Sequence, residues 1–110
     1  MISYNDSAAT VTALGSALAD ATPLRAKFNL VNSAAASTGV SLPAGAVAGE
    51  SVVVMITAAN AVLVYPATAA GTIAGGSAGA GYSQALTNEK TKQAMYICWG
   101  NDVWTRIISG

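Results

Sequence analysis

Residues 50–76 read Glu-Ser-Val-Val-Val-Met-Ile-Thr-Ala-Ala-Asn-Ala-Val-Leu-Val-Tyr-Pro-Ala-Thr-Ala-Ala-Gly-Thr-Ile-Ala-Gly-Gly. Two runs rich in β-branched residues, 51–57 and 61–65, flank a short Ala-Ala-Asn segment. Such runs favour strands, and Pro66 cannot donate a hydrogen bond to a sheet. We therefore predict a β-hairpin whose second strand stops at Tyr65. The first run is continuously apolar, which is typical of a strand covered on both faces.

The rest of the chain repeats this pattern of short strands and turns. Residues 24–30 alternate, which predicts a half-buried strand with Leu24, Ala26, Phe28 and Leu30 facing the core. Further strands are expected at 38–42, 72–74, 81–86, 93–99 and 103–108, and Gly100-Asn101-Asp102 is a typical tight hairpin turn. About eight strands in one domain indicate an all-β fold. We expect an antiparallel β-sandwich, jelly-roll-like, or a small barrel over residues 23–110.

Residues 1–22 differ from this β-rich part. A short helix would place Val11, Leu14 and Leu18 on one face, but Gly15 weakens it and Pro23 would end it. We favour an extended N-terminal arm that lies on a neighbouring molecule, because so thin an apolar stripe cannot hold a helix by itself. Tyr4 would be an anchor on this arm. The candidate interface residues are therefore Tyr4, Val11, Leu14 and Leu18.

The composition describes a folded chain with an uncharged surface. Hydrophobic residues make up 53% of the 110 residues, charged residues only 9%, and five basic residues balance five acidic ones. A surface with so little charge is expected to be buried against other chains. The sequence has no basic cluster for nucleic acid and no basic amphipathic or long apolar segment for a membrane. The N-terminal residues also lack the pattern of a signal peptide.

The residue types needed for most catalytic and metal sites are missing or scattered. The chain has no histidine and one cysteine, Cys98, which is expected to be a small buried hydrophobe. The five acidic residues stand singly, in expected turns, arms or strand ends, where solvated carboxylates are the simplest interpretation. We therefore expect no enzyme, no cofactor and no metal site.

Two tryptophans flank the last turn. Trp99 and Trp104 could stack on a sugar if both were exposed at the rim of the sandwich, but we expect at least one of them in the core. A glycan ligand is therefore an alternative, and the carbohydrate-binding module is the corresponding class of protein.

Five motifs follow one another between residues 38 and 108: Ser41-Leu42-Pro43-Ala44-Gly45, Gly49-Glu50-Ser51-Val52-Val53-Val54, Asn60-Ala61-Val62-Leu63-Val64-Tyr65-Pro66, Gly71-Thr72-Ile73-Ala74-Gly75, and the ending Met95 to Trp99 with Val103-Trp104. Their order resembles the small β-domains of tailed-bacteriophage virion proteins, in particular head decoration (capsid cement) proteins.

The resemblance implies a non-enzymatic structural protein on the capsid surface of the virion, made in the host cytoplasm. Its partners would be the major capsid protein and other copies of itself, with a homotrimer expected. An N-terminal arm would reach over the shell or a neighbouring subunit. The alternatives are a tail-fibre or baseplate β-domain of the same virion, and the carbohydrate-binding module.

Overall fold

A computed structural model describes residues 6–15, 17–32, 38–56, 62–84 and 93–108. In these residues the chain is mostly strand, and the single helical element is one turn of 3₁₀-helix, η1 (Leu18–Asp20). The described residues contain ten strands, in the order β1 (Asp6–Thr12), β2 (Thr22–Pro23), β3 (Ala26–Asn32), β4 (Gly39–Ser41), β5 (Ser51–Ile56), β6 (Val62–Tyr65), β7 (Thr72–Ile73), β8 (Tyr82–Gln84), β9 (Gln93–Gly100) and β10 (Val103–Ile108).

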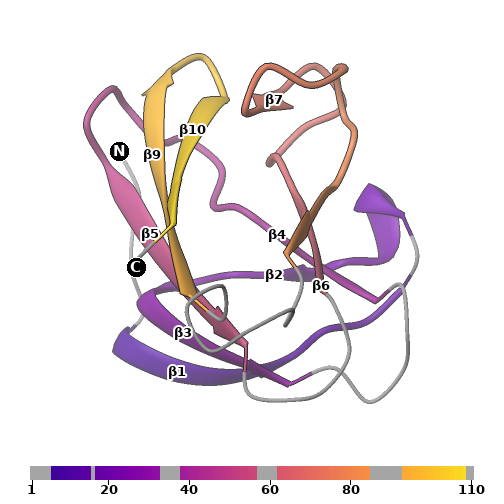
Figure 1. Cartoon of the computed structure of the whole chain (residues 1–110), viewed down its shortest axis with the longest axis vertical. Coiled ribbons are helices and arrows are strands. Elements are labelled where there is room, and N and C mark those ends of the chain that lie inside the picture. The colour runs from indigo at the N-terminus through magenta and orange to yellow at the C-terminus, as the bar shows by residue number, and fades with distance from the viewer. Residues whose placement is uncertain (1–5, 16, 33–37, 57–61, 85–92, 109–110) are drawn as a thin grey trace.

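The strands form two sheets that enclose one core (Figure 1). The larger sheet has six strands in the order β1-β3-β5-β9-β10-β7, and the smaller has four in the order β2-β4-β6-β8. β1, β3 and β5 are parallel, β2, β4 and β6 are parallel, and β7 is parallel to β10. The pairs β5/β9, β9/β10 and β6/β8 are antiparallel.

The predicted antiparallel sandwich, jelly-roll or barrel is therefore wrong. From β1 to β6 each strand lies in the opposite sheet from the one before it. When the chain returns to a sheet it runs in its earlier direction, which makes neighbouring strands parallel. The strand pairing is thus mixed and parallel, as is usual in α/β proteins. The described residues are nevertheless mostly strand.

The predicted hairpin between the two β-branched runs is also wrong. β5 lies in the six-stranded sheet and β6 in the four-stranded sheet, so the two strands do not pair. The inward side chains of both strands are buried in the same core: Val52, Val54 and Ile56 from β5, Val62 and Val64 from β6. The two runs pack face to face rather than edge to edge, and residues 57–61 between them lie outside the described residues. β5 is covered on one face only, because Met55 is exposed on the other.

The prediction of which side chains of residues 24–30 face the core is partly wrong. Leu24 and Ala26 are buried as expected, but Phe28 and Leu30 are exposed, and Asn29 and Val31 are buried in their place. The Asn29 amide is accommodated because its Nδ2 donates to the carbonyl oxygens of Ala26 (2.9 Å) and Val53 (3.2 Å). Two apolar side chains assigned to the core therefore point away from it.

The C-terminal hairpin is confirmed. β9 and β10 pair across the predicted turn, in which Asn101 and Asp102 have φ of 52° and 59°. Asparagine and aspartate tolerate this left-handed region better than most residues. Cys98 is buried, as predicted.

Residues 6–12 belong to the sheet rather than to a free arm, and residues 1–5 of the predicted arm lie outside the described residues. β1 pairs along its length with β3 of the same chain and forms one edge of the six-stranded sheet. This pairing replaces the predicted arm over a neighbouring molecule, because β3 offers the backbone hydrogen bonds that the segment needs.

Candidate interaction surface

The six-stranded sheet has a second, outward-pointing face opposite the core. We call it the outer face, and it consists of the outward side chains of β1, β3, β5, β9 and β10. Its exposed or half-buried apolar members are Ala8, Phe28, Leu30, Val53, Met55, Met95, Ile97, Trp99, Val103 and Ile107. Soluble domains seldom expose large apolar side chains in a contiguous group, so this face is the candidate functional site.

Strand register places these side chains in rows. Ala8 is beside Phe28, Phe28 beside Val53, Val53 beside Met95, and Met95 beside Ile107. One apolar row therefore crosses five strands. Leu30 and Met55 form the start of a second row next to it. Neighbouring side chains on one face of a sheet contact one another, so the rows are continuous.

The outward side chains within residues 8–12, 28–32, 51–55, 95–99 and 103–107 include no charged group. Lys27, which precedes Phe28 on β3, donates from its Nζ to Ser51 Oγ at 2.9 Å. Arg106, although next to Ile107, makes its contacts elsewhere: Nε donates to the Tyr96 hydroxyl (3.3 Å) and Nη1 to the Tyr82 hydroxyl (3.2 Å). The guanidinium also lies 4.5 Å from the centre of the Tyr82 ring, which ties β10 to the four-stranded sheet.

Tyr96 takes its electrostatic character from burial. Its side chain is fully buried, and burial raises the pKa of its hydroxyl to about 12, against a smaller opposing effect of Arg106. The phenol is therefore neutral at physiological pH and accepts the hydrogen bond from Arg106.

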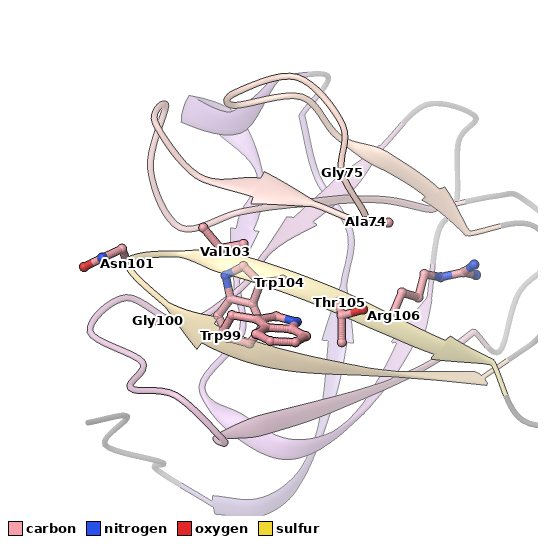
Figure 2. A pocket seen from close by; sticks show the side chains of 9 residues that line it. All are labelled: Ala74, Gly75, Trp99, Gly100, Asn101, Val103, Trp104, Thr105 and Arg106. Carbon is pink, nitrogen blue, oxygen red and sulfur yellow. The ribbon is translucent and has the colours of Figure 1, made fainter.

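The two tryptophans have opposite environments. Trp104 is 1% exposed and belongs to the core, whereas Trp99 is 71% exposed at one end of the outer face. The prediction that at least one tryptophan is buried is confirmed. A shallow hollow lies beside this hairpin end, and Figure 2 shows the residues that line it, including Trp99, Asn101, Val103 and Thr105, with Ala74 and Gly75 from the segment after β7.

A second hollow lies near the N-terminal edge. Val11 and Leu14, both predicted interface residues, line it together with Ala9, Thr10, Thr12, Thr22, Pro23, Arg25 and Ala26. Leu14 is 56% exposed, whereas Val11 is half-buried and packs against the core. Leu18 lies on η1 and is not among the residues that line this hollow, and Tyr4 lies outside the described residues. The structure thus brings together two of the four predicted residues.

The sequence contained a signal for the outer face that the prediction of candidate residues did not use. In β9 both alternating sets are apolar, with Ala94, Tyr96 and Cys98 buried and Met95, Ile97 and Trp99 on the other side. A strand that is apolar on both faces of a two-layer fold indicates that something covers the second face.

Metal-binding and membrane-spanning elements were sought in the described part of the chain. No group of three or more cysteine, aspartate or glutamate side chains there is placed to hold a metal ion. No helix in the same residues is long and apolar enough to cross a bilayer. Comparison of the sequence and structure with protein-family models, curated proteins and solved structures found no match.

Proposed function

We propose that this chain is a structural, non-enzymatic protein of a tailed-bacteriophage particle that binds the major capsid protein and stabilises the head. The observation that carries the proposal is the outer face, where one uncharged apolar row crosses five strands. An apolar face of this kind is stabilised when it packs against other protein and is removed from water. The chain is therefore suited to act as one subunit among others.

The particular assembly is inferred from the resemblance over residues 38–108. Decoration proteins bind at the outside of the shell, which gives this chain a location on the virion and an origin in the host cytoplasm. Many weak contacts, repeated over a shell, add to a large stabilisation, because each further contact within one assembly is intramolecular. An oligomer such as a trimer would increase this effect.

The test uses particles of the phage that encodes the chain, produced with its coding sequence deleted. Particles lacking the chain are expected to release DNA at a lower temperature, and the purified chain added back should co-sediment with them and restore the release temperature. Met95→Glu, which puts a charge in the apolar row, should fail to restore it. Val47→Ser, at an exposed apolar residue in the turn before β5, is the matched control and should restore it fully.

Particles that are equally stable without the chain, and that do not bind it, would overturn the proposal. Binding to the tail rather than the head would instead identify a fibre or baseplate component, the alternative within the same particle.

Carbohydrate binding is a second candidate because of Trp99. Its indole is 71% exposed beside a hollow that also presents the Asn101 and Thr105 side chains. Exposed aromatic rings stack on sugars, and neighbouring polar groups give orientation. Glycan-array binding that is lost in Trp99→Ala, with unchanged head stability, would favour this candidate.

A further inference from the structure

We infer that the outer face is covered by a second copy of this chain, with the two six-stranded sheets packed face to face. The inference rests on the proposed function, in which the chain acts as a subunit of an assembly, and it names the first occupant of the face. Three observations carry it: the size of the face, its lack of charge, and the arrangement of large and small side chains across it.

The size of the face matches what a stable pair requires. Strands lie about 4.8 Å apart and rise about 3.3 Å per residue, so five strands of six residues span roughly 500 Å² in projection. Two copies would together bury about 1,000 Å² or more, the size at which specific interfaces begin. Among the exposed contributors are Trp99 (71%), Phe28 (51%) and Ile107 (51%), so the interface would contain the bulky side chains that dominate binding energy.

The lack of charge favours a copy of the same face as the occupant. A face that carried charges of one sign would repel its own copy and would require a partner of opposite sign. The outward side chains within residues 8–12, 28–32, 51–55, 95–99 and 103–107 include none, and the ammonium group of Lys27 donates a hydrogen bond to Ser51. Two such faces can therefore meet without a buried unpaired charge, which would otherwise oppose association.

The apolar row is also complementary to itself. A two-fold axis that runs along the strands between β5 and β9 places β3 of one copy opposite β10 of the other. Phe28 of one copy then faces Ile107 of the other, and the half-buried Val53 faces the more exposed Met95. In each pair a larger side chain lies opposite a smaller one. Packed sheets lie about 10 Å apart, a distance that side chains of these sizes fill.

Sedimentation velocity of the purified full chain, from about 1 to 200 µM, tests the inference without any phage particle. The wild-type chain is expected to self-associate. Met95→Glu should raise the dissociation constant at least about 100-fold, because the carboxylate would be buried without a partner. Phe28→Thr should raise it about tenfold, and threonine, which is β-branched, suits the strand. The matched control is Leu14→Glu, at an exposed apolar residue outside the outer face, and should change it less than about threefold.

Circular dichroism and thermal melting of each variant would show that the fold is kept, and Phe28→Thr maintains the test if Met95→Glu does not fold. A chain that is monomeric at the highest concentration would overturn the inference. So would an oligomer that Leu14→Glu dissociates and Met95→Glu and Phe28→Thr leave intact, since the contact would then lie at the N-terminal hollow.

The result is separable from that of the particle experiment. A chain that pairs through the outer face but does not bind phage heads would retain this inference and overturn the proposed virion role. A monomeric chain that binds and stabilises heads would do the reverse.

Discussion

Asp102 connects the C-terminal hairpin to the loop before β7. Its Oδ1 accepts hydrogen bonds from Trp104 Nε1 (2.7 Å) and the Ala67 amide (3.0 Å), and its Oδ2 accepts from the Thr68 amide and hydroxyl, both at 2.8 Å. One carboxylate thus satisfies the indole N–H of the buried Trp104 and two backbone N–H groups. An ionised acceptor makes each of these bonds stronger than a neutral one would.

Asp102→Asn is expected to lower the free energy of unfolding by about 2 kcal/mol, because the amide presents an N–H₂ group to donors that need an acceptor. Asparagine tolerates the positive φ at this position, so backbone strain is not part of the change. Urea denaturation measures the effect, with Asn101→Gly, at the adjacent exposed turn position, as the control expected to be near neutral. Equal stabilities for wild type and Asp102→Asn would show that the charge and the second acceptor oxygen of Asp102 contribute no net stability.

Tyr96 makes stability depend on pH in the alkaline range. Its pKa is about 12 in the folded protein, against 10.0 for the unperturbed group. The folded state therefore holds the proton more tightly, so this contribution is complete below pH 10 and is lost as the pH rises from 10 towards 12. We expect the free energy of unfolding to fall over this range, and to fall less steeply in Tyr96→Phe, which cannot ionise. Urea denaturation at several pH values between 8 and about 11.5 measures both, and parallel curves would contradict the assignment.

At the scale of elements, the sequence predicted what depends on local chemistry. The β9/β10 hairpin follows from two apolar runs around Gly-Asn-Asp, and both strands and turn are found. The end of β6 at Tyr65 follows from Pro66. Ile73 is the one large side chain between residues 67 and 81, and it is buried in the core.

Sheet membership could not be predicted in the same way. Two β-branched runs separated by a short Ala-Ala-Asn segment are compatible with a hairpin and with strands in opposite sheets, and only contacts with distant strands decide between them. β5 finds its neighbours in β3 and β9, and β6 in β4 and β8. The direction of β3 side chains was missed for a related reason. Alternation fixes which residues share a face but not which face is buried, and the Nδ2 group of the buried Asn29 donates to the carbonyl of Val53 on another strand.

The residues of the outer face differ from the interface residues that the sequence predicted. Val11 and Leu14 line one hollow, but the outer face became visible only when pairing placed Phe28, Val53 and Met95 side by side. These residues come from three strands far apart in the sequence, so no local pattern could have grouped them.

The N-terminal strand gives a test at the same scale. Deletion of residues 1–12 removes β1, an edge strand paired with β3 alone. We expect the shortened chain to fold cooperatively, with a melting temperature lower by roughly 10 °C. Deletion of residues 1–22, the predicted arm, also removes Ala13 and Ala21, which are buried, and should cost more. Thermal melts of the two shortened chains beside the full chain measure the difference, and loss of a cooperative transition on removal of residues 1–12 alone would show that β1 is essential to the core.

At the scale of the whole molecule, low charge determines how the chain associates. With five positive and five negative residues and none among the outward side chains within residues 8–12, 28–32, 51–55, 95–99 and 103–107, association should depend little on ionic strength. We expect the dissociation constant of the self-associated chain to change less than about threefold between about 0.05 and 0.5 M NaCl. Sedimentation at these salt concentrations measures it. A tenfold weakening at high salt would mean that charged groups outside the outer face hold the copies together.

The alternation of strands between the two sheets also determines when the chain can fold. Among the described strands, β9 and β10 are the only consecutive pair that hydrogen-bond to each other, and every other pairing joins segments separated by at least one intervening strand. Non-local pairing slows folding, so we expect refolding to take milliseconds to seconds. Stopped-flow fluorescence of the buried Trp104 measures the rate. Refolding that is complete within microseconds would contradict this expectation. On a ribosome the consequence is stronger. Synthesis releases the N-terminus first, so the most local pairing, β9 with β10, is the last of the described pairings to emerge. The four-stranded sheet is complete once β8 has been made, but the six-stranded sheet cannot be completed until β10 has been synthesised.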